Sequence, residues 1–146
     1  MEELQKAAKI AFASEYAFVI KAQNFHWNVE GMFFEQFHAL FGGIYEEVYG
    51  SIDAFAENIR KLDSYTPASF QRFSMLTQVE DENAIIDSKS MTIELLNDSD
   101  KMVKVLKMVY DLAEQAGEHG FSNFLAERMD AHRKHGWMLR SSIKSQ

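Results

Sequence analysis

The chain has 146 residues, of which 47% are apolar, and it carries a formal net charge of −7 and no cysteine. This length suits one domain with a substantial core over residues 1–146, and the missing thiols exclude disulfides, thiol catalysis and zinc–thiolate sites. The acidic balance disfavours general electrostatic binding to nucleic-acid phosphates. The start lacks the features of a secretory signal and no apolar run approaches the ~20 residues of a membrane span, so we expect a cytoplasmic protein.

The first helical pattern covers about 25 residues from the beginning of the chain, with apolar side chains at the three- and four-residue spacing of an amphipathic helix. Its single break in phase is Glu15. The apolar positions are Leu4, Ala8, Ala11, Phe18, Ala22 and Phe25. Residues 28–32, around Gly31, predict a tight connection to the next helix.

The second pattern predicts one continuous helix over residues 34–62, because its apolar positions keep one face along the whole segment. These positions are Phe37, Phe41, Ile44, Val48, Ile52, Phe55, Ile59 and Leu62. Gly42, Gly43 and Gly50 lower its helix propensity by about 1 kcal/mol each, and we expect them to admit close approach of another backbone.

The middle of the chain predicts a short helix. Thr66 as N-cap and Pro67 in the first helical position form its start signal. We expect this helix to lie across the longer ones and to bury Phe70 and Phe73. Residues 78–83 are polar and acidic and are typical of a loop or a helix entry.

Two further long helices follow. The third pattern keeps one phase across the polar residues 97–100 and is expected to end at Gly117 and Gly120. The fourth begins with Ser122 or Asn123 as its cap. Their apolar positions are Met91, Leu95, Met102, Val105, Val109, Leu112 and Ala116, then Leu125, Met129, Leu139 and Ile143. The patterns together predict an all-α four-helix bundle with a short extra helix in the connection between the second and third long helices.

Two histidines and two carboxylates form the most informative spacing in the chain. His26 ends the first predicted helix, His38 lies near the start of the second, and Asp53 and Glu57 lie one turn apart near its far end. Such a mixed set suits iron or another borderline divalent metal. His38 and Asp53 lie ~22 Å apart along a continuous helix, at 1.5 Å per residue. Either these residues form no site, or two antiparallel copies of the helix build it at a twofold subunit interface.

Structural roles compete with this metal hypothesis. Asp53, Glu57 and Glu46 share the polar face of their helix, where acidic side chains are usually solvated. His132 and His135, one turn apart, form a second histidine pair that is a rival metal site. A core or surface role is favoured for them, because no acidic partner stands at helical spacing.

Another type of metal site is incomplete. Intrasubunit di-iron bundles take a Glu-x-x-His motif from two helices, and this chain has it once, at Glu35 and His38. The eight methionines lie at helical spacings that are typical of core filling rather than copper binding.

The sequence around the two histidines and two carboxylates resembles the signature of the Dps family, the twelve-subunit miniferritins with ferritin-like topology. It consists of Asn24-Phe25-His26-Trp27-Asn28-Val29-Glu30-Gly31, then Phe34, His38 and Phe41, then Asp53-x-x-Ala56-Glu57-x-Ile59-Arg60-x-Leu62. Residues 123–128 and 132–140 look like that family's last helix. The match covers about residues 15–62 and 120–143.

The resemblance implies that His26 and His38 of one subunit and Asp53 and Glu57 of its twofold mate form a ferroxidase centre. It implies that Fe(II) binds there and is oxidised, typically by hydrogen peroxide, and that a ferric mineral grows inside a hollow dodecameric shell. It further implies that Trp27, beside the centre, intercepts stray radical equivalents.

The resemblance also implies an iron-entry pore, because family members have pore residues at the start of the last helix. The candidates are Glu118, Asn123, Glu127 and Asp130. An acidic constriction concentrates cations, so we expect neutral amides at Glu127 and Asp130 to slow mineralisation.

The chain departs from the family pattern at one ligand position. Many members carry an aspartate one turn after the second histidine, where this chain has Gly42. We therefore expect a second iron to be held more weakly than the first, with Glu46 as partial compensation. On this interpretation Gly42→Asp tightens the second site.

A second departure concerns DNA. Family members that bind DNA often have a Lys-rich N-terminal tail, whereas the first helix here begins almost at Met1. Lys6, Lys9 and Lys21 are the obvious contributors to any basic patch. We expect weak or no binding to duplex DNA at physiological salt.

Three functions remain open from the sequence. They are a peroxide-consuming ferroxidase and iron-storage shell, a DNA-compacting architectural protein with secondary metal chemistry, and a helical bundle used only for assembly with a degraded site. The four-ligand set favours the first over the third. The acidic balance and the missing basic tail favour the first over the second.

Overall fold

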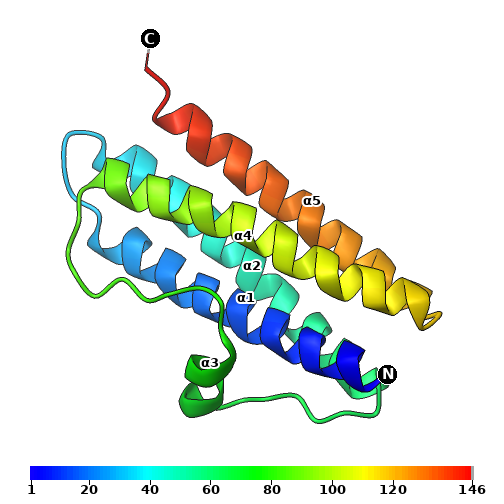
Figure 1. Cartoon of the computed structure of the whole chain (residues 1–146). Helices are drawn as coiled ribbons and strands as arrows, with labels where there is room; N and C mark the ends of the chain where they lie inside the picture. Colours follow the sequence, from blue (N-terminus) through cyan, green and yellow to red (C-terminus); the bar gives the residue numbers. More distant parts are fainter. Residues whose placement is uncertain (146) are drawn as a thin grey trace.

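Four long α-helices form an elongated bundle in the computed structural model, which describes residues 1–145 (Figure 1). They are α1 (Glu2–Asn28), α2 (Phe34–Lys61), α4 (Ser88–Gln115) and α5 (His119–Ser142). α1 and α2 form one antiparallel pair, and Gly31 in their connection has a φ of +126°, which L side chains rarely adopt. α4 and α5 form the second pair. The predicted all-α bundle is confirmed, and none of the described residues forms a strand.

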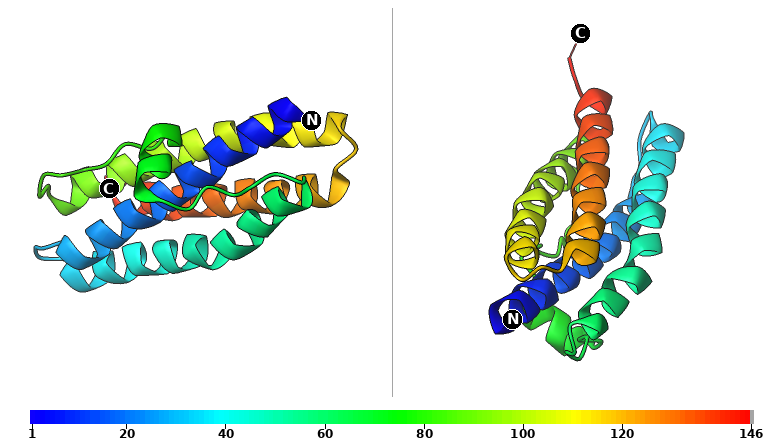
Figure 2. Two further views of the ribbon diagram at one scale, coloured as in Figure 1. Left: turned by 90° about the horizontal axis from the view of Figure 1, so that it is seen from below. Right: turned by 90° about the vertical axis from the view of Figure 1, so that its right-hand side faces the viewer.

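The connection between α2 and α4 runs along the bundle, so these two helices point in the same direction (Figures 1 and 2). It contains the short helix α3 (Phe70–Leu76), which packs against α1. α2 ends where Asp63 takes a φ of 60°, in the left-handed region, and turns the chain away from the helix axis. The sequence patterns predicted this topology, in which the connection between the second and third long helices carries the short extra helix.

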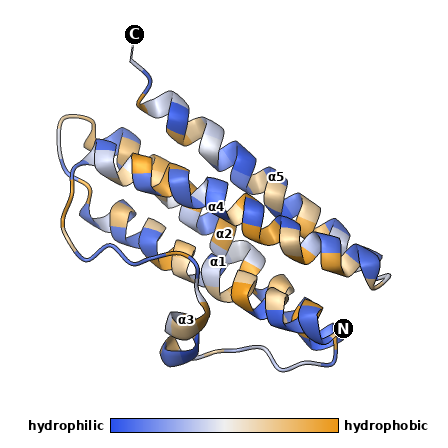
Figure 3. Cartoon of the chain, viewed as in Figure 1, coloured by the Kyte–Doolittle hydropathy of each residue, from blue (hydrophilic) through white to orange (hydrophobic). Residues whose placement is uncertain are grey.

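The apolar stripes of the long helices meet in one core, and hydrophilic residues gather on the outward faces (Figure 3). Phe18, Phe25, Phe41 and Phe55 are fully buried at its centre. Burial of such a side chain contributes about 2–3 kcal/mol, so these rings fix how α1 and α2 are rotated about their own axes. None of the helices in residues 1–145 has the length and apolar character needed to cross a membrane.

The start of α3 differs from the prediction. Its N-cap is Ser69, whose hydroxyl accepts a hydrogen bond from a backbone N–H three residues further on, at 3.2 Å. Thr66 is not the cap, because its hydroxyl donates to the carbonyl oxygen of Ala56 in α2 at 2.8 Å. Pro67 therefore lies in the irregular segment before α3 rather than in its first turn.

The burial predicted for α3 is only half correct. Phe73 packs on the core, with its ring stacked on Tyr16 at 4.7 Å between centroids. Phe70 is 84% exposed, so the expectation that it is buried is wrong. A helix this short has one core-facing side, and Phe70 lies off it.

The junction between α4 and α5 also differs from the prediction. α5 begins before Ser122 and Asn123, with Glu118 as its N-cap and no side-chain capping bond. Ser122 lies buried inside the helix, and its hydroxyl donates to a carboxylate at the end of α4 at 2.7 Å. Gly117, with a φ of +75°, ends α4 as predicted, whereas Gly120 already belongs to α5.

Candidate metal centre

His26 and His38 form a stacked pair where α1 ends and α2 begins. His26 stands in the last turn of α1 and His38 in the second turn of α2. The ring centroids lie 3.9 Å apart and the ring planes meet at 15°. Phe34 also stacks on His38, at 5.0 Å, and Tyr45 lies 5.5 Å from His26. Both histidines are half-buried, and we call them the His26–His38 pair.

Two hydrogen bonds fix the tautomer of both rings in the His26–His38 pair. Nδ1 of each imidazole lies 2.6 Å from the main-chain carbonyl oxygen of the other residue. A carbonyl oxygen only accepts, so each Nδ1 carries a hydrogen and donates it. A neutral ring then has its lone pair on Nε2, which is the form that binds a metal ion.

The two predicted carboxylate ligands lie elsewhere on α2. Asp53 and Glu57 are exposed on one face of the helix. Because α2 is continuous, Asp53 lies ~22 Å from His38 along the axis, at 1.5 Å per residue. Within residues 1–145, no three His, Asp or Glu side chains gather closely enough to hold a metal ion. The structure brings the two histidines together and leaves the carboxylates apart, and the complete centre stays a prediction.

Three other predicted residues lie near the His26–His38 pair in sequence. Trp27 is 64% exposed beside His26, and Glu46 is exposed on α2. At Gly42 an ideal Cβ would lie 2.7 Å from Cε1 of His26. The geometry argues against the expectation that Gly42→Asp simply adds a ligand, because an aspartate would first have to displace that imidazole.

The predicted pore residues lie at the start of α5. Glu118 is the N-cap, and Asn123, Glu127 and Asp130 are exposed on one face of the helix at intervals of four and three residues. The acidic face is present in one chain. The pore itself requires neighbouring subunits and stays a prediction.

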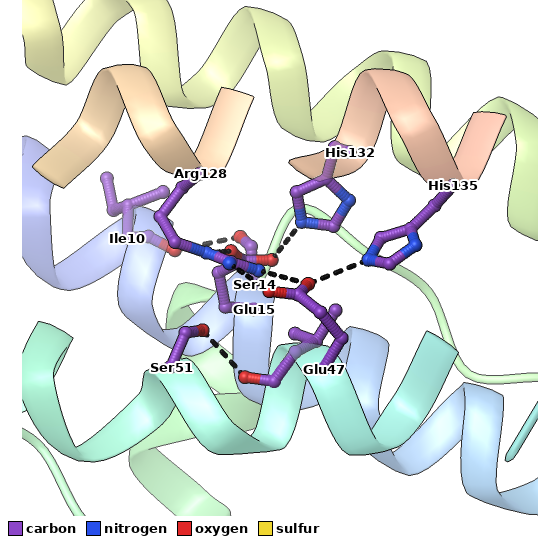
Figure 4. Close-up of polar contacts among 9 residues, drawn as sticks. Ile10, Ser14, Glu15, Glu47, Ser51, Arg128, His132 and His135 are labelled. Atoms are coloured by element: carbon purple, nitrogen blue, oxygen red, sulfur yellow. Dashed lines mark hydrogen bonds and ion pairs between the residues drawn. The ribbon is translucent and has the colours of Figure 1, made fainter. Parts of the chain in front are cut away.

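The second histidine pair belongs to a network that joins α1, α2 and α5 inside the bundle (Figure 4). Nε2 of His132 lies 2.6 Å from Oε1 of Glu15, and Nε2 of His135 lies 2.7 Å from Oε1 of Glu47. Arg128 joins the two halves. Its terminal nitrogens lie 2.6 and 3.0 Å from the oxygens of Glu47, and its Nε lies 3.5 Å from Glu15. We call these five residues the buried network; four of their side chains are buried, and that of Glu47 is 41% exposed.

Ion pairs and hydrogen bonds keep the two carboxyl groups of the buried network ionised. Burial by itself raises the pKa of Glu15, but His132 and Arg128 outweigh burial and hold that pKa below its ordinary value. Burial also raises the pKa of Glu47, and bonds from His135 and Arg128 bring it well below the usual range. Both groups are therefore carboxylates, which only accept, so Nε2 of each histidine donates. Neither Nδ1 has a hydrogen-bond partner within residues 1–145.

The buried network is a structural cluster and not a metal site. The guanidinium of Arg128 pairs with both carboxylates, and Nε2 of both imidazoles is already used in a hydrogen bond. The sequence left a core or a surface role open for His132 and His135, and the structure shows both of them in the core. Their acidic partners come from other helices, which helical spacing does not reveal, and the break in phase at Glu15 is the one signal in the sequence.

One lysine of α1, Lys21, is buried. Nζ of Lys21 lies 2.8 Å from Asp98 and 3.1 Å from Glu94, both on α4, and its side chain is 6% exposed. The expectation that Lys21 contributes to a basic patch is wrong, because two carboxylates already neutralise it. Lys6 remains exposed and Lys9 is half-buried.

Known proteins resemble this chain over nearly its whole length. The sequence model of the ferritin-like domain matches residues 5–145. A DNA protection during starvation protein of Brevibacillus brevis is 27% identical over 125 residues, which cover 86% of this chain and 84% of the relative. An uncharacterized low temperature-induced protein of Nostoc sp. is 30% identical over 92% of this chain and 76% of its own length.

Solved structures share the fold. Dps from Thermosynechococcus elongatus superposes with a TM-score of 0.96 at 22% identity, over 99% of this chain and 92% of that one. The Dps protein from Vibrio cholerae O1, described as a member of a broad superfamily of ferritin-like diiron-carboxylate proteins, has a TM-score of 0.93 at 26% identity, over 98% and 90%. The ferritin-like match over residues 5–145, together with the Dps-named relatives, shows that the chain belongs to the Dps miniferritin family.

Proposed function

We propose that the protein binds Fe(II) at a ferroxidase centre shared between two subunits, oxidises it with hydrogen peroxide and stores the ferric product in a hollow shell. The observation that carries this proposal is the His26–His38 pair. Its Nδ1 atoms are tied to carbonyl oxygens, so both Nε2 atoms are set up as ligands. Two imidazoles joined by carboxylates suit Fe(II).

A second copy of the chain supplies the carboxylates in this proposal. Two antiparallel copies of α2 bring His38 next to Asp53 and Glu57 of the partner subunit, because these positions lie toward opposite ends of the helix. Gly43 and Gly50 lie between them and are exposed; apart from their chain neighbours and the backbone of α2 itself, no atom lies within 4 Å of where their side chains would begin. This space is what a second α2 backbone needs for close approach.

Exposed apolar side chains favour the same partner. Trp27, Met32 and Phe33 lie in or beside the connection between α1 and α2, and Met32 is 91% exposed. Phe70 and Met75 are exposed on α3. Large exposed apolar groups of this kind mark protein–protein contacts. A second copy is the occupant that also completes the ligand set, and we propose that the contacts repeat in a closed dodecamer.

The proposed reaction balances with two Fe(II) and one peroxide. Each Fe(II) gives up one electron, the O–O bond breaks, and the two oxygens take up two protons and leave as water. Delivery of both electrons to one peroxide avoids release of hydroxyl radical. Asp53 and Glu57 stabilise the additional positive charge of Fe(III), and Trp27 donates an electron to any one-electron oxidant that escapes.

Iron supply uses the acidic face of α5. Glu118, Asn123, Glu127 and Asp130 line the proposed entry, where negative charge raises the local concentration of cations. The ferric product then accumulates inside the shell. We propose the cytoplasm as the place where the protein works.

Direct DNA compaction is the weaker alternative. A relative is named for DNA protection, but this chain has a net charge of −7 and Lys21 is buried in ion pairs. Removal of Fe(II) and peroxide protects DNA without contact. The acidic surface therefore favours protection by iron chemistry.

Peroxide-driven iron loading tests the proposal. The purified assembled protein is loaded with Fe(II) without oxygen, peroxide is added, and ferric absorbance, peroxide consumption and spin-trapped radicals are followed. We expect rapid oxidation at two Fe(II) per peroxide, a soluble ferric core and little hydroxyl radical. Oxidation no faster than in buffer, or precipitation of the ferric product, would contradict the proposed function.

A further inference from the structure

Gly42 leaves a slot in α2 that the imidazole of His26 fills. An ideal Cβ at this position would lie 2.7 Å from Cε1, 2.8 Å from Nδ1 and 3.5 Å from Nε2 of His26. Real Cβ contacts do not fall below 3.0 Å, so even a methyl group here requires the ring to move. Gly42 has an ordinary helical φ. The glycine is thus needed for space and not for backbone conformation.

Neighbouring groups hold the ring of His26 in place. One face stacks on His38 at 3.9 Å between centroids, and its Nδ1 is held 2.6 Å from the carbonyl oxygen of that residue. Tyr45 lies close on another side, at 5.5 Å between centroids. A shift large enough to admit a side chain at position 42 breaks the bond that keeps the hydrogen on Nδ1. The ring is then free to change tautomer and lose its Nε2 lone pair.

We propose that Gly42 is a positioning residue of the metal centre, because its missing side chain lets the helix backbone support His26 in its ligand orientation. The inference rests on the proposed function of the His26–His38 pair. It also limits the ligand set. A carboxylate at position 42 and the observed place of His26 exclude each other, so the centre has two imidazoles from one chain and two carboxylates from the partner. Such a set holds one borderline divalent metal tightly and leaves the second Fe(II) of the proposed reaction more weakly held.

Cobalt binding to two glycine variants tests this role. Co²⁺ is titrated into the assembled, iron-free parent, Gly42→Ala and Gly136→Ala proteins, and its visible absorption is followed. Gly136 is the matched control, because it is also a buried helical glycine, but an added Cβ there meets its nearest side-chain atom at an ordinary 3.6 Å. We expect about one tight Co²⁺ per chain in the parent and the control, and affinity at least ~10-fold weaker in Gly42→Ala.

A crystal structure of metal-free Gly42→Ala separates this inference from the proposed function. We expect the His26 ring displaced and its Nδ1 bond to the carbonyl oxygen of His38 lost. An unmoved ring, or parent-like Co²⁺ affinity in a correctly assembled variant, overturns the positioning role. Gly42→Asp extends the test. We expect this variant to bind Co²⁺ more weakly than the parent, and tighter binding would contradict the positioning role of Gly42. Failure of the parent to bind Co²⁺ overturns the proposed function instead, and the crystal structure still decides whether Gly42 holds the ring.

Discussion

The two histidine pairs of this chain use the same side chain in opposite ways. In the His26–His38 pair, Nδ1 donates to carbonyl oxygens and Nε2 is left as a potential ligand. His132 and His135 instead donate through Nε2 to carboxylates and keep Nδ1 buried. The first pair is half-buried at a connection between helices, whereas the second lies inside the bundle.

The partner atom decides what each pair can do. A neutral carbonyl oxygen orients an imidazole and adds no charge, so the ring can still accept a metal ion. A carboxylate forms a charge-assisted bond and satisfies the ring within the fold. Two histidines one turn apart at His132 and His135 therefore stabilise the bundle, while the two histidines on different helices are the pair that we propose for the metal centre.

The largest expected effect on stability comes from removing an imidazole of the buried network. His132→Ala leaves Glu15 fully buried with Arg128 as its remaining partner, and breaking a buried pair costs about 3–5 kcal/mol of unfolding free energy. Denaturant unfolding at fixed protein concentration measures this loss. His38→Ala is the matched change in the other pair, and we expect a loss of about 1 kcal/mol or less. Equal losses in both variants would remove the distinction between the pairs.

The reverse pattern is expected for iron chemistry. His38→Ala removes one of the two nitrogen ligands, so Fe(II) oxidation should slow about 100-fold or more. His135→Ala should keep the parent rate per assembled subunit, because its imidazole contributes no ligand. Stopped-flow absorbance after peroxide addition provides both rates. A His38 variant as fast as the parent would show that the metal centre lies elsewhere.

Acid should act on the buried network before it unfolds the parent completely. A carboxyl group whose pKa is lowered by folding stabilises the protein above its unfolded pKa, and this contribution is lost as pH falls toward the folded pKa. Glu15 and Glu47 both have lowered pKa values. The parent should therefore lose stability progressively below the ordinary carboxyl pKa of 4.5.

Glu15→Gln sharpens this pH test. The variant should be less stable than the parent at neutral pH, since the partners of Glu15 lose their counter-charge, but its stability should fall less steeply on acidification. Unfolding midpoints from neutral pH down to about 3 give the two slopes. Parallel slopes would mean that Glu15 carries no share of the acid sensitivity.

The smallest expected effect concerns iron supply. Glu127→Gln with Asp130→Asn removes two negative charges from the exposed face of α5, and mineralisation should slow several-fold because fewer cations are drawn to the entry. Affinity for Co²⁺ at the His26–His38 pair should not change. The slowing should also shrink at high salt, where charge is screened. Unchanged uptake in the double variant would exclude these positions as the entry.

The regular spacing of apolar residues along each long helix made the bundle predictable from the sequence. The stripe from Phe37 to Leu62 has one phase, so it defines one helix and one buried face however the rest of the chain folds. Helix starts were less predictable because capping depends on what else binds the side chain. Thr66 looks like a cap but bonds to Ala56, and Ser69 takes its place.

The candidate site was predictable as a spacing and not as a geometry. The intervals between His26, His38 and Asp53 are visible in the chain, but the reciprocal carbonyl bonds depend on how the connection at Gly31 folds back. The slot at Gly42 is invisible in the sequence, because the group that fills it comes from another helix. Three-dimensional packing supplies this information.

Mixed assemblies give the most direct test of a centre shared between subunits. His38→Ala and Asp53→Asn chains, each inactive alone, are co-assembled in equal amounts, and mixing is checked by native mass spectrometry. A mixed twofold pair contains one centre with both residues intact, so random mixing should restore about a quarter of the parent rate of Fe(II) oxidation. Verified mixing without recovery would contradict the shared centre, since a site within one chain is damaged in every subunit.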